Sequence, residues 1–490
     1  MKKISDHVSY REATKSITAK RKGLDNTPNE EQTENMQFIA KTIFEPLRDA
    51  LGRKPIGISS FFRSAEVNVA VGGSNNSQHC FDEQTEILTD NGWKNIDTFD
   101  IYRDKIGSYN INNDKIEFLE GDECIIFNYK GPVECCKNKH INYVVDPDHR
   151  IYAHNTSKNS QYNFYKAKDC NNKRRTHKVA GIRDRGVSDL PHLNFAKLCM
   201  AVISDGSISK KKDVSNFFIR FNLKRKYKLE KIEYLLKLNE IAYNKRYCEN
   251  REKQGQFGVY EYTIESHQAI HIIELIEGKD KKIPIKFLNY SSEELQELID
   301  EYGTFDGCFD KREGNTGLTI FSTNEYNIDM LQIMSILSNR RCIKKEFLDR
   351  ETNFGILDKF YNLYISNHNT SRVNEDNTYR IEYEGKLWTV NNQNTTLIVR
   401  RNGKVFITGN CKGQAVDIDG DIIGLHSNKE IFDWIYNNGS FDQMISEFPD
   451  KNGEPGWVHV SKTKQGNREE TLVAFYDKNG DPAYRYYENT

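Results

Sequence analysis

The chain reads as one sequence interrupted by a second, with the breaks directly before Cys80 and directly before Cys411. The letters SQH end at His79, and CKGQAVD begins at Cys411, so removing residues 80–410 joins the flanks as SQHCKGQAVD. In the joined text, His79 stands seven positions before Asp417. The intervening segment begins with Cys80 and ends with Asn410, immediately before Cys411. We therefore expect two proteins, one encoded inside the other.

Length and composition favour several folded domains and give no sign of a membrane protein. A chain of 490 residues exceeds what one hydrophobic core usually organises. Its hydrophobic content of 37% and net charge of -1 are typical of folded domains and leave a nucleic-acid partner open. No stretch approaches the roughly 18 apolar residues of a membrane span, and the polar start lacks a secretory signal. These features predict synthesis in the cytoplasm.

The cysteines are confined to the insert and its downstream junction. All ten lie between Cys80 and Cys411, and none belongs to a CxxC pair. A disulfide framework or a zinc ribbon would show another distribution. We therefore expect Cys80 and Cys411 to take part in a reaction and not to have a structural role.

Residue types at the junctions permit peptide rearrangement without an external energy source or a cofactor. The Cys80 thiol can attack the His79 carbonyl to form a thioester, which Cys411 then accepts by exchange. The Asn410 side-chain amide can cyclise onto its own carbonyl and cut the last bond. A final shift from sulfur to nitrogen would join His79 to Cys411 through an amide.

The ends of the insert resemble those of inteins. CFDEQTEILTDNGWKNIDTF (80–99) is similar to an amino-terminal splicing block, and NTTLIVRRNGKVFITGNC (394–411) is similar to the matching carboxy-terminal blocks. VVDPDHRIYAH (144–154) resembles the block that usually reads Thr-x-x-His, which makes His149 the expected activator of the first bond. The resemblance implies the all-β Hint horseshoe.

Three positions depart from that family pattern. Asp146 stands where Thr is usual and is carried over as a splicing residue, Gly409 replaces the frequent penultimate His, and Leu387 occupies the place of a helpful Asp or Cys. The group that assists Asn410 is therefore unassigned at this stage.

A further domain is expected inside the insert, which is about twice as long as a minimal Hint unit. FAKLCMAVISDGSIS (195–209) and ELQELIDEYGTFDGCF (294–309) both read as apolar helices that end in Asp-Gly. One such ending is commonly an ordinary helix terminus. Two copies resemble the paired helices of LAGLIDADG homing endonucleases, an α/β fold.

That resemblance implies that Asp205 and Asp306 hold Mg²⁺ over a scissile phosphate. The implied partner is double-stranded DNA at the intein-free allele. Basic residues near the following strands would contact phosphates, although such runs are also typical of a solvated face; they are Lys210, Lys211, Lys212, Arg220, Lys224, Arg225 and Lys226. Whether the endonuclease is active stays open.

The joined flanks resemble the M15 family of zinc D-Ala-D-Ala carboxypeptidases and peptidoglycan peptidases, through SxxRSxxxN, GGSxNSQH, GxAxD and WxHxS. The resemblance implies that His79, Asp417 and His459 bind Zn²⁺ and leave one position for water. Arg63 would grip a substrate carboxylate, and Glu447 is the first candidate for the general base.

Each host residue also has a simpler interpretation. Glu454 is a second candidate for the base. His459 could be a core histidine, Arg63 a surface ion pair and Glu447 a solvated side chain.

The expected architecture is a multidomain chain with an α+β M15 host (hedgehog and DD-peptidase-like) over 1–79 and 411–490. An all-β Hint domain would span 80–185 and 375–410, and an α/β endonuclease would span 190–372. The predicted function is a precursor that splices itself, releasing the intein and a ligated, lysin-like peptidase that acts on the peptidoglycan stem peptide at the cell wall. The alternative is a non-catalytic wall-binding or virion module carrying an endonuclease-defective intein. The sequence leaves open the bond cut and the oligomeric state.

Overall fold

The computed structural model describes residues 3–28, 30–64, 67, 80–121, 123–156, 161–186, 189–210, 217–249, 258–310, 317–352, 355–410, 415–462, 467, 469–476 and 482–487. The chain is a mixture of helices and extensive sheet, divided into two compact units. Unit 1 comprises residues 1–77 and 411–490, and unit 2 comprises residues 78–410. Within the described part of the chain, no helix has the length and apolar character needed to cross a membrane.

Unit 1 is an α+β assembly built from both flanks. Its described strands form one sheet in the order β1-β24-β26-β25-β27-β28, in which only the β25–β27 pair is parallel. The strands are β1 (Ile58–Ser60), β24 (Ala415–Ile418), β25 (Gln443–Glu447), β26 (Trp457–Ser461), β27 (Glu470–Tyr476) and β28 (Pro482–Tyr486). The helices are α1 (Tyr10–Ala13), α2 (Ile17–Lys22), α3 (Glu30–Ile39), η1 (Ala40–Phe44), α4 (Glu45–Ala50), η8 (Gly420–Ile422) and α11 (Asn428–Asn438).

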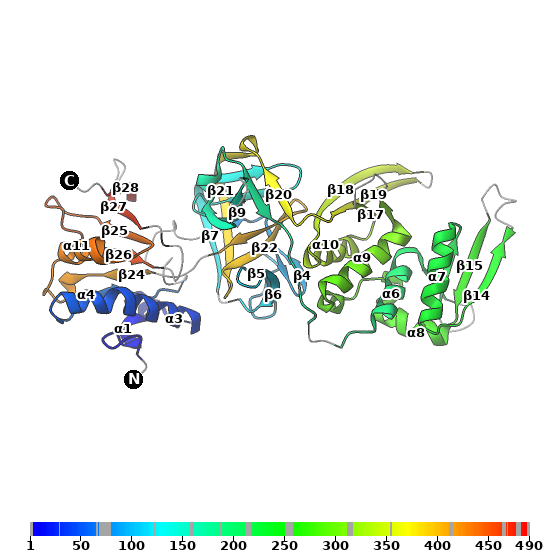
Figure 1. The fold of residues 1–490 in the computed structure, drawn as a ribbon, viewed down its shortest axis with the longest axis horizontal. Helices are drawn as coiled ribbons and strands as arrows, with labels where there is room; N and C mark the ends of the chain where they lie inside the picture. The colour runs from blue at the N-terminus through cyan, green and yellow to red at the C-terminus, as the bar shows by residue number, and fades with distance from the viewer. Residues whose placement is uncertain are drawn as a thin grey trace. The chain divides into compact units, whose positions relative to one another are not determined.

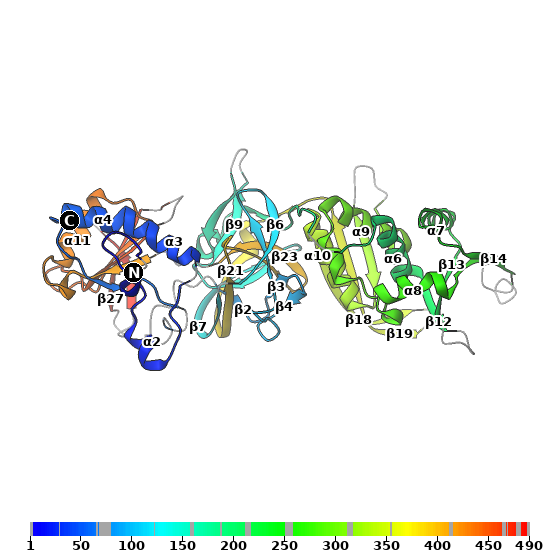
Figure 2. The same cartoon turned by 90° about the horizontal axis from the view of Figure 1, so that it is seen from below.

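Helices α3, η1 and α4 run continuously along the sheet of unit 1 (Figures 1 and 2). Val416, Ile418, Val458 and Val460 are buried in one core with Ile43 and other apolar residues of these helices. Because side chains alternate along a strand, Asp417 and His459 face the other side of the sheet. The apolar positions thereby bring two polar side chains together on one surface.

The strand-rich part of unit 2, residues 80–178 and 370–410, is built almost wholly from strands. Those before the internal domain are β2 (Phe81–Asp82), β3 (Glu86–Thr89), β4 (Gly92–Lys94), β5 (Ile106–Asn110), β6 (Lys115–Leu119), β7 (Glu123–Lys137), β8 (Asn142–Val145), β9 (Arg150–Asn155), β10 (Asn163–Lys166) and β11 (Arg175–Lys178), with η3 (Ala167–Cys170). Those after it are β20 (Thr370–Val373), β21 (Thr378–Asn391), β22 (Thr396–Arg401) and β23 (Lys404–Gly409), with η7 (Glu375–Asn377).

Long strands from the two ends of the insert pair directly in this part. β21 runs antiparallel to β7 from Thr378↔Cys136 to Asn391↔Glu123, and β2, β21, β7 and β8 close into a barrel. Strands from before and after the internal domain therefore share one barrel.

The internal domain contains the same topology twice. The first copy is α6 (Leu193–Asp205), β12 (Ser207–Lys210), β13 (Phe217–Leu223), α7 (Lys226–Leu238), β14 (Asn244–Cys248) and β15 (Val259–Ile264), followed by α8 (Ser266–Leu275), η5 (Gly278–Asp280) and η6 (Ile285–Asn289). The second is α9 (Ser292–Asp306), β16 (Gly307–Phe309), β17 (Leu318–Ser322), α10 (Glu325–Leu337), β18 (Arg341–Thr352) and β19 (Gly355–Ser366).

Both copies order their strands in the same way, β12-β13-β15-β14 and β16-β17-β19-β18. Helices α6 and α9 pack against each other and lie side by side in both views (Figures 1 and 2). The repeat therefore places equivalent helix ends next to each other.

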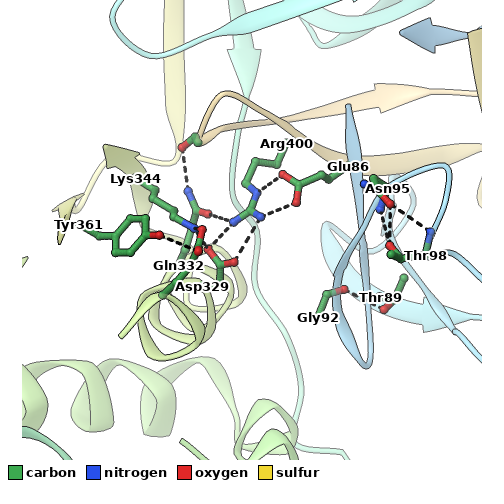
Figure 3. A network of polar contacts seen from close by, with 12 residues as sticks. Glu86, Thr89, Gly92, Asn95, Thr98, Asp329, Gln332, Lys344, Tyr361 and Arg400 are labelled. Carbon is green, nitrogen blue, oxygen red and sulfur yellow. Dashed lines mark hydrogen bonds and ion pairs between the residues drawn. The ribbon is translucent and has the colours of Figure 1, made fainter. Parts of the chain in front are cut away.

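A network of ion pairs connects the internal domain to strands β3 and β22 (Figure 3). The Arg400 guanidinium in β22 binds Glu86 at 2.6 Å and Asp329 of α10 at 2.6 Å, and it stacks on the Trp93 ring. Lys344 also binds Asp329, at 2.6 Å. The Gly403 carbonyl accepts hydrogen bonds from Gln332 and from the Lys344 backbone. These contacts hold the internal domain to the hairpin formed by β22 and β23, which ends directly before Asn410.

Strand β20 pairs with β11 from Thr370↔Lys178 to Val373↔Arg175, across the boundary expected near residue 372. The pairing partner of a strand depends on register with distant residues, which the local sequence at 370–373 did not show.

Candidate functional sites

Asp146 contacts the first residue of the insert. The backbone N–H of Cys80 donates to Asp146 Oδ2 at 2.5 Å, and the Asp146 N–H donates to the Cys80 carbonyl at 3.1 Å. Asp148 N–H donates to Asp146 Oδ1 at 2.9 Å. Burial raises the pKa of the Asp146 carboxyl well above its usual range. The side chain that replaces the usual Thr is therefore a buried acid hydrogen bonded to the backbone nitrogen of Cys80.

The tautomer of His149 follows from its partner Thr408. The Thr408 hydroxyl donates to the Arg150 carbonyl at 2.9 Å, so its oxygen accepts from His149 Nε2, 2.7 Å away. A neutral His149 then carries its proton on Nε2, while Nδ1 faces Asp146 Oδ2 at 3.8 Å. The fully buried imidazole is thereby oriented towards the acid that binds Cys80.

Asn410 is buried at the end of β23, beside the same segment. Its Nδ2 donates to the Val390 carbonyl at 2.9 Å, and its own carbonyl accepts a hydrogen bond from Arg150 Nη1 at 2.8 Å. Asn410 Oδ1 has no hydrogen-bond partner among the residues that the structure describes. Arg150 was not among the residues predicted from sequence, although it directly follows His149.

The predicted zinc ligand His79 and the predicted splicing residue Cys411 lie outside the described residues. Leu387, at the position of the helpful Asp or Cys, is fully buried in β21 opposite Phe127 and Asp82. An apolar side chain in that core position has no proton to exchange.

In the internal domain, Asp205 and Asp306 end the packed helices α6 and α9. Burial, together with the charge of Asp205, raises the pKa of Asp306 to about 6. The two acids line one cavity, along with Lys224, Arg225 and Lys228. Such repulsion between carboxylates fits a divalent cation, which Asp205 and Asp306 would hold and which would supply Lewis-acid stabilisation of a phosphate.

Two lysines missed at the sequence level accompany these acids. Lys228 forms an ion pair with Asp205 at 2.5 Å and also donates to the Phe305 carbonyl. Lys281 donates to the Gly206 carbonyl at 2.9 Å, and burial lowers its pKa. The spacing of these lysines from the acids in sequence carried no signal, because helix packing alone brings them together.

The basic residues expected along the DNA path differ in their surroundings. Arg220 in β13 pairs with the buried Glu261 at 3.3 Å, whereas the exposed Arg225 donates to the Tyr227 hydroxyl at 3.0 Å. Lys226 pairs with Glu230 at 3.7 Å. Lys211 and Lys212 lie outside the described residues. The Arg220 guanidinium is thus already paired with a carboxylate of the neighbouring strand β15.

In unit 1, Asp417 of β24 and His459 of β26 are direct cross-strand partners. His459 Nδ1 lies 2.7 Å from Asp417 Oδ1, and Arg63 Nη2 lies 3.4 Å from Asp417 Oδ2. Burial alone would lower the pKa of His459, but the hydrogen bond and charge of Asp417 outweigh it and raise that pKa. Three of the residues predicted for the host site therefore converge on one surface.

Glu447 lies on the same surface as His459. Residue 445 pairs with His459 and Glu447 pairs with Trp457, which makes Glu447 and His459 diagonal neighbours across β25 and β26. Burial raises the pKa of Glu447 to about 7. Glu454 instead lies in the loop between these strands and accepts from the Lys429 N–H at 2.9 Å, at the start of α11.

The donor types on this surface fit zinc, because imidazole nitrogens and carboxylate oxygens are ligands that zinc takes. Asp417 and His459 would hold the ion, which would polarise a peptide carbonyl and acidify water. The described residues contain no cluster of three or more potential ligands. The third predicted ligand, His79, is outside them.

Comparison with protein families finds a match to Peptidase M15 over residues 6–104. The matched range begins in unit 1 and continues past residue 78 into unit 2. The comparison with curated proteins finds no match.

Among solved structures, the chain is similar to an I-DmoI variant in complex with its target DNA, at 16% identity and a TM-score of 0.26, over 36% of this chain and 87% of that one. It is also similar to the homing endonuclease I-WcaI bound to its DNA recognition sequence, at 18% identity and a TM-score of 0.26, over 37% and 78% of the two chains. A splice-inactive variant of the AceL NrdHF class 3 split intein matches at 6% identity and a TM-score of 0.24, over 68% and 99%. The functions proposed for this chain rest on its own residues and contacts.

Proposed function

We propose that the chain is a self-splicing precursor. One observation carries the proposal: both ends of the insert, far apart in sequence, meet the segment 146–150. Cys80 is bound by Asp146, and the carbonyl of Asn410 is bound by Arg150. Splicing requires the cysteine and the asparagine at the two ends of the insert to share such a segment.

In the proposed first step, the Cys80 sulfur attacks the His79 carbonyl carbon and the bond from that carbon to the Cys80 nitrogen breaks. Asp146, protonated in its buried site, gives its proton to the departing nitrogen, to which it is already hydrogen bonded, and takes the thiol proton in exchange. His149, oriented by Thr408, faces the same Asp146 oxygen at 3.8 Å. Exchange onto Cys411, cyclisation of Asn410 and a final shift of the acyl group from the Cys411 sulfur to its nitrogen complete the reaction.

Mass spectrometry of the whole chain tests this proposal directly. Under reducing, metal-free conditions, the expected products are the ligated flanks and the free insert. A precursor with Cys80→Ala and Asn410→Ala is the matched control and is expected to keep its translated mass. If the unmodified chain also keeps that mass, the proposal is wrong.

For the host, we propose a zinc-dependent peptidase that acts on peptidoglycan, supported by the convergence of Asp417, His459 and Glu447 on one sheet surface. With its pKa near 7, Glu447 can accept a proton from water and pass it to the leaving amine. Because His79 and Asp417 flank the insert, the ligated product is expected to bind zinc better than the blocked precursor. Zinc content and wall hydrolysis of the product, each lost in His459→Ala, would support an enzyme over a binding module.

For the internal domain, we propose a DNA endonuclease, supported by the twofold repeat and its adjacent terminal acids. Lys228 and Lys281 would offset charge on the cleaved strand. Incubation with DNA that spans the intein-free junction and Mg²⁺ is expected to yield cleavage near the codons of His79 and Cys411. Intact DNA under these conditions would instead support a domain that has lost activity.

A further inference from the structure

We propose that the DNA-binding surface of the internal domain continues onto the strand-rich part of unit 2, where strand β23 and the turn between β7 and β8 contact phosphates of the same duplex. The inference rests on the proposed endonuclease function and deepens it, because it assigns a second contact region to the same partner. The cations of this region are Lys137, Lys139, Arg341, Lys345 and Lys404.

One row of side chains crosses five strands on a single face of the sheet. Directly paired residues of antiparallel strands point to the same face. The row begins at Cys308 of β16, which pairs with Thr319 of β17. It continues through Tyr364 of β19 and Ile343 of β18 to Lys404 of β23. This face therefore does not end at the edge of the internal domain.

The same face opens to the two acids of the internal domain. Phe321 of β17 lines the cavity that Asp205 and Asp306 also line. Phe321 pairs with Asn362, and Asn362 pairs with Lys345 of β18. Residues two apart on a strand share a face, so this second row lies beside the first one. A duplex placed over the acids thus meets the face that leads to β23.

The turn between β7 and β8 adds cations beside Lys404. Lys404 Nζ donates to the Asn138 carbonyl at 2.5 Å. The N–H of His140 donates to Asn138 Oδ1 at 2.8 Å, which fixes the conformation of the turn. Lys139 within this turn and Lys137 directly before it are exposed. The turn therefore presents two lysines to solvent next to the end of the row.

The charges around this turn are predominantly positive. Burial and the charges of neighbouring lysines lower the pKa of Lys404. Burial and the charge of Arg341 are the largest causes that lower the pKa of His140, to about 4. Within the part of the chain that the structure describes, neither Lys137 nor Lys139 forms an ion pair. Clustered cations without carboxylate partners are typical of a surface that binds nucleic-acid phosphates.

The width of the sheet sets how far from the cleavage point these cations act. Strand β16 directly follows Asp306, and β23 lies four strands further along the sheet. Four spacings of about 4.8 Å give about 19 Å. Because phosphates of one DNA strand follow each other every 3.4 Å or so, the added contacts are expected up to about six base pairs from the cleaved bonds.

The test measures binding of the full chain to DNA. The protein is the blocked precursor with Cys80→Ala and Asn410→Ala, which cannot splice. The probe is a duplex that spans the joined codons of His79 and Cys411, with Ca²⁺ in place of Mg²⁺. Affinity is measured over a range of salt concentrations, and hydroxyl-radical footprinting locates the protected nucleotides.

Lys137→Gln with Lys139→Gln removes two exposed cations from the proposed contact region. Each lost phosphate contact lowers the slope of log affinity against log salt by about 0.9, so a decrease of about 2 is expected. Affinity at low salt is expected to fall by about tenfold or more. Protection is expected to shorten on one side of the cleavage point and to persist at its centre.

Lys105→Gln with Lys130→Gln is the matched control. These two lysines are also exposed and lie in the strand-rich part of unit 2, but they pair with Glu120 at 3.1 Å and with Glu384 at 2.8 Å. Their replacement removes the same net charge and is expected to leave the salt slope and the footprint unchanged. Equal weakening by both double substitutions would overturn the inference, because net charge alone would then explain the effect.

The remaining outcomes separate this inference from the proposed endonuclease function. Parental affinity, salt slope and footprint after Lys137→Gln with Lys139→Gln would overturn the inference alone. If the unmodified chain with Mg²⁺ leaves DNA intact while binding still depends on the two lysines, the endonuclease proposal is wrong and the surface is supported. A blocked precursor that binds no duplex at low salt would overturn both.

Discussion

Replacing Asp146 by asparagine tests how the first splicing step is driven. The buried carboxyl accepts N–H groups from Cys80 and Asp148 through different oxygens. Asparagine offers only one acceptor oxygen, so one N–H would face an amide NH₂ group, at a cost of about 1 to 3 kcal/mol. It also cannot carry a proton, and loss of a positioned acid–base group slows a reaction by about 100-fold or more.

The assay is thiol-induced cleavage before residue 80, in an Asn410→Ala precursor that cannot complete splicing. Asp146→Asn is expected to reduce its rate by at least about 100-fold. Asp146→Thr, the family-typical residue, is expected to retain more activity than asparagine because its hydroxyl can exchange a proton.

Asp148→Asn provides the control for a lost carboxylate in the same turn. Asp148 pairs with Lys166 at 3.2 Å and with Lys168 at 2.9 Å. Near-parental cleavage is expected for this variant. If Asp146→Asn also cleaves at the parental rate, with both variants folded by circular dichroism, the assigned role of Asp146 is refuted.

Three further outcomes follow from the structure. Arg400→Met removes the cation of the partly buried Glu86 and one of the two cations of Asp329, so urea titration should show unit 2 less stable by about 1 to 3 kcal/mol, whereas the exposed Arg103→Met should change stability by less than about 0.5 kcal/mol. Burial lowers the pKa of His177 to about 3, so between about pH 6.5 and pH 3 the unfolded chain binds a proton that the folded chain does not bind. The free energy of unfolding should therefore fall by up to about 1.4 kcal/mol for each pH unit below pH 6.5. In His177→Phe this decrease should be less steep. Equal slopes would contradict this assignment. Asp205→Asn with Asp306→Asn should abolish DNA cleavage and leave splicing intact; loss of both would indicate a folding defect.

Local sequence was most informative where the signal is carried by neighbouring residues. The apolar stretches that end at Asp205 and Asp306 lie in α6 and α9, and the alternating Trp457–Ser461 segment forms β26. Helix periodicity and strand alternation are local patterns, so they can be interpreted without knowing the partners. The reactive residue types at the junctions were likewise visible in the sequence alone.

Contacts between distant segments required the tertiary structure. Nothing near Arg150 in sequence indicates that it reaches the Asn410 carbonyl, because that contact depends on the pairing of Ile151 with Thr408 between β9 and β23. The crowding around Gly409 was hidden for the same reason, since the atoms that a Cβ there would meet belong to Arg150 of β9 and Phe164 of β10. Sequence by itself determined which chemical groups the chain possesses and which short segments form helices or strands. Only the packed sheets decided which of those groups meet, because strand register joins residues whose separation along the chain carries no information about their distance.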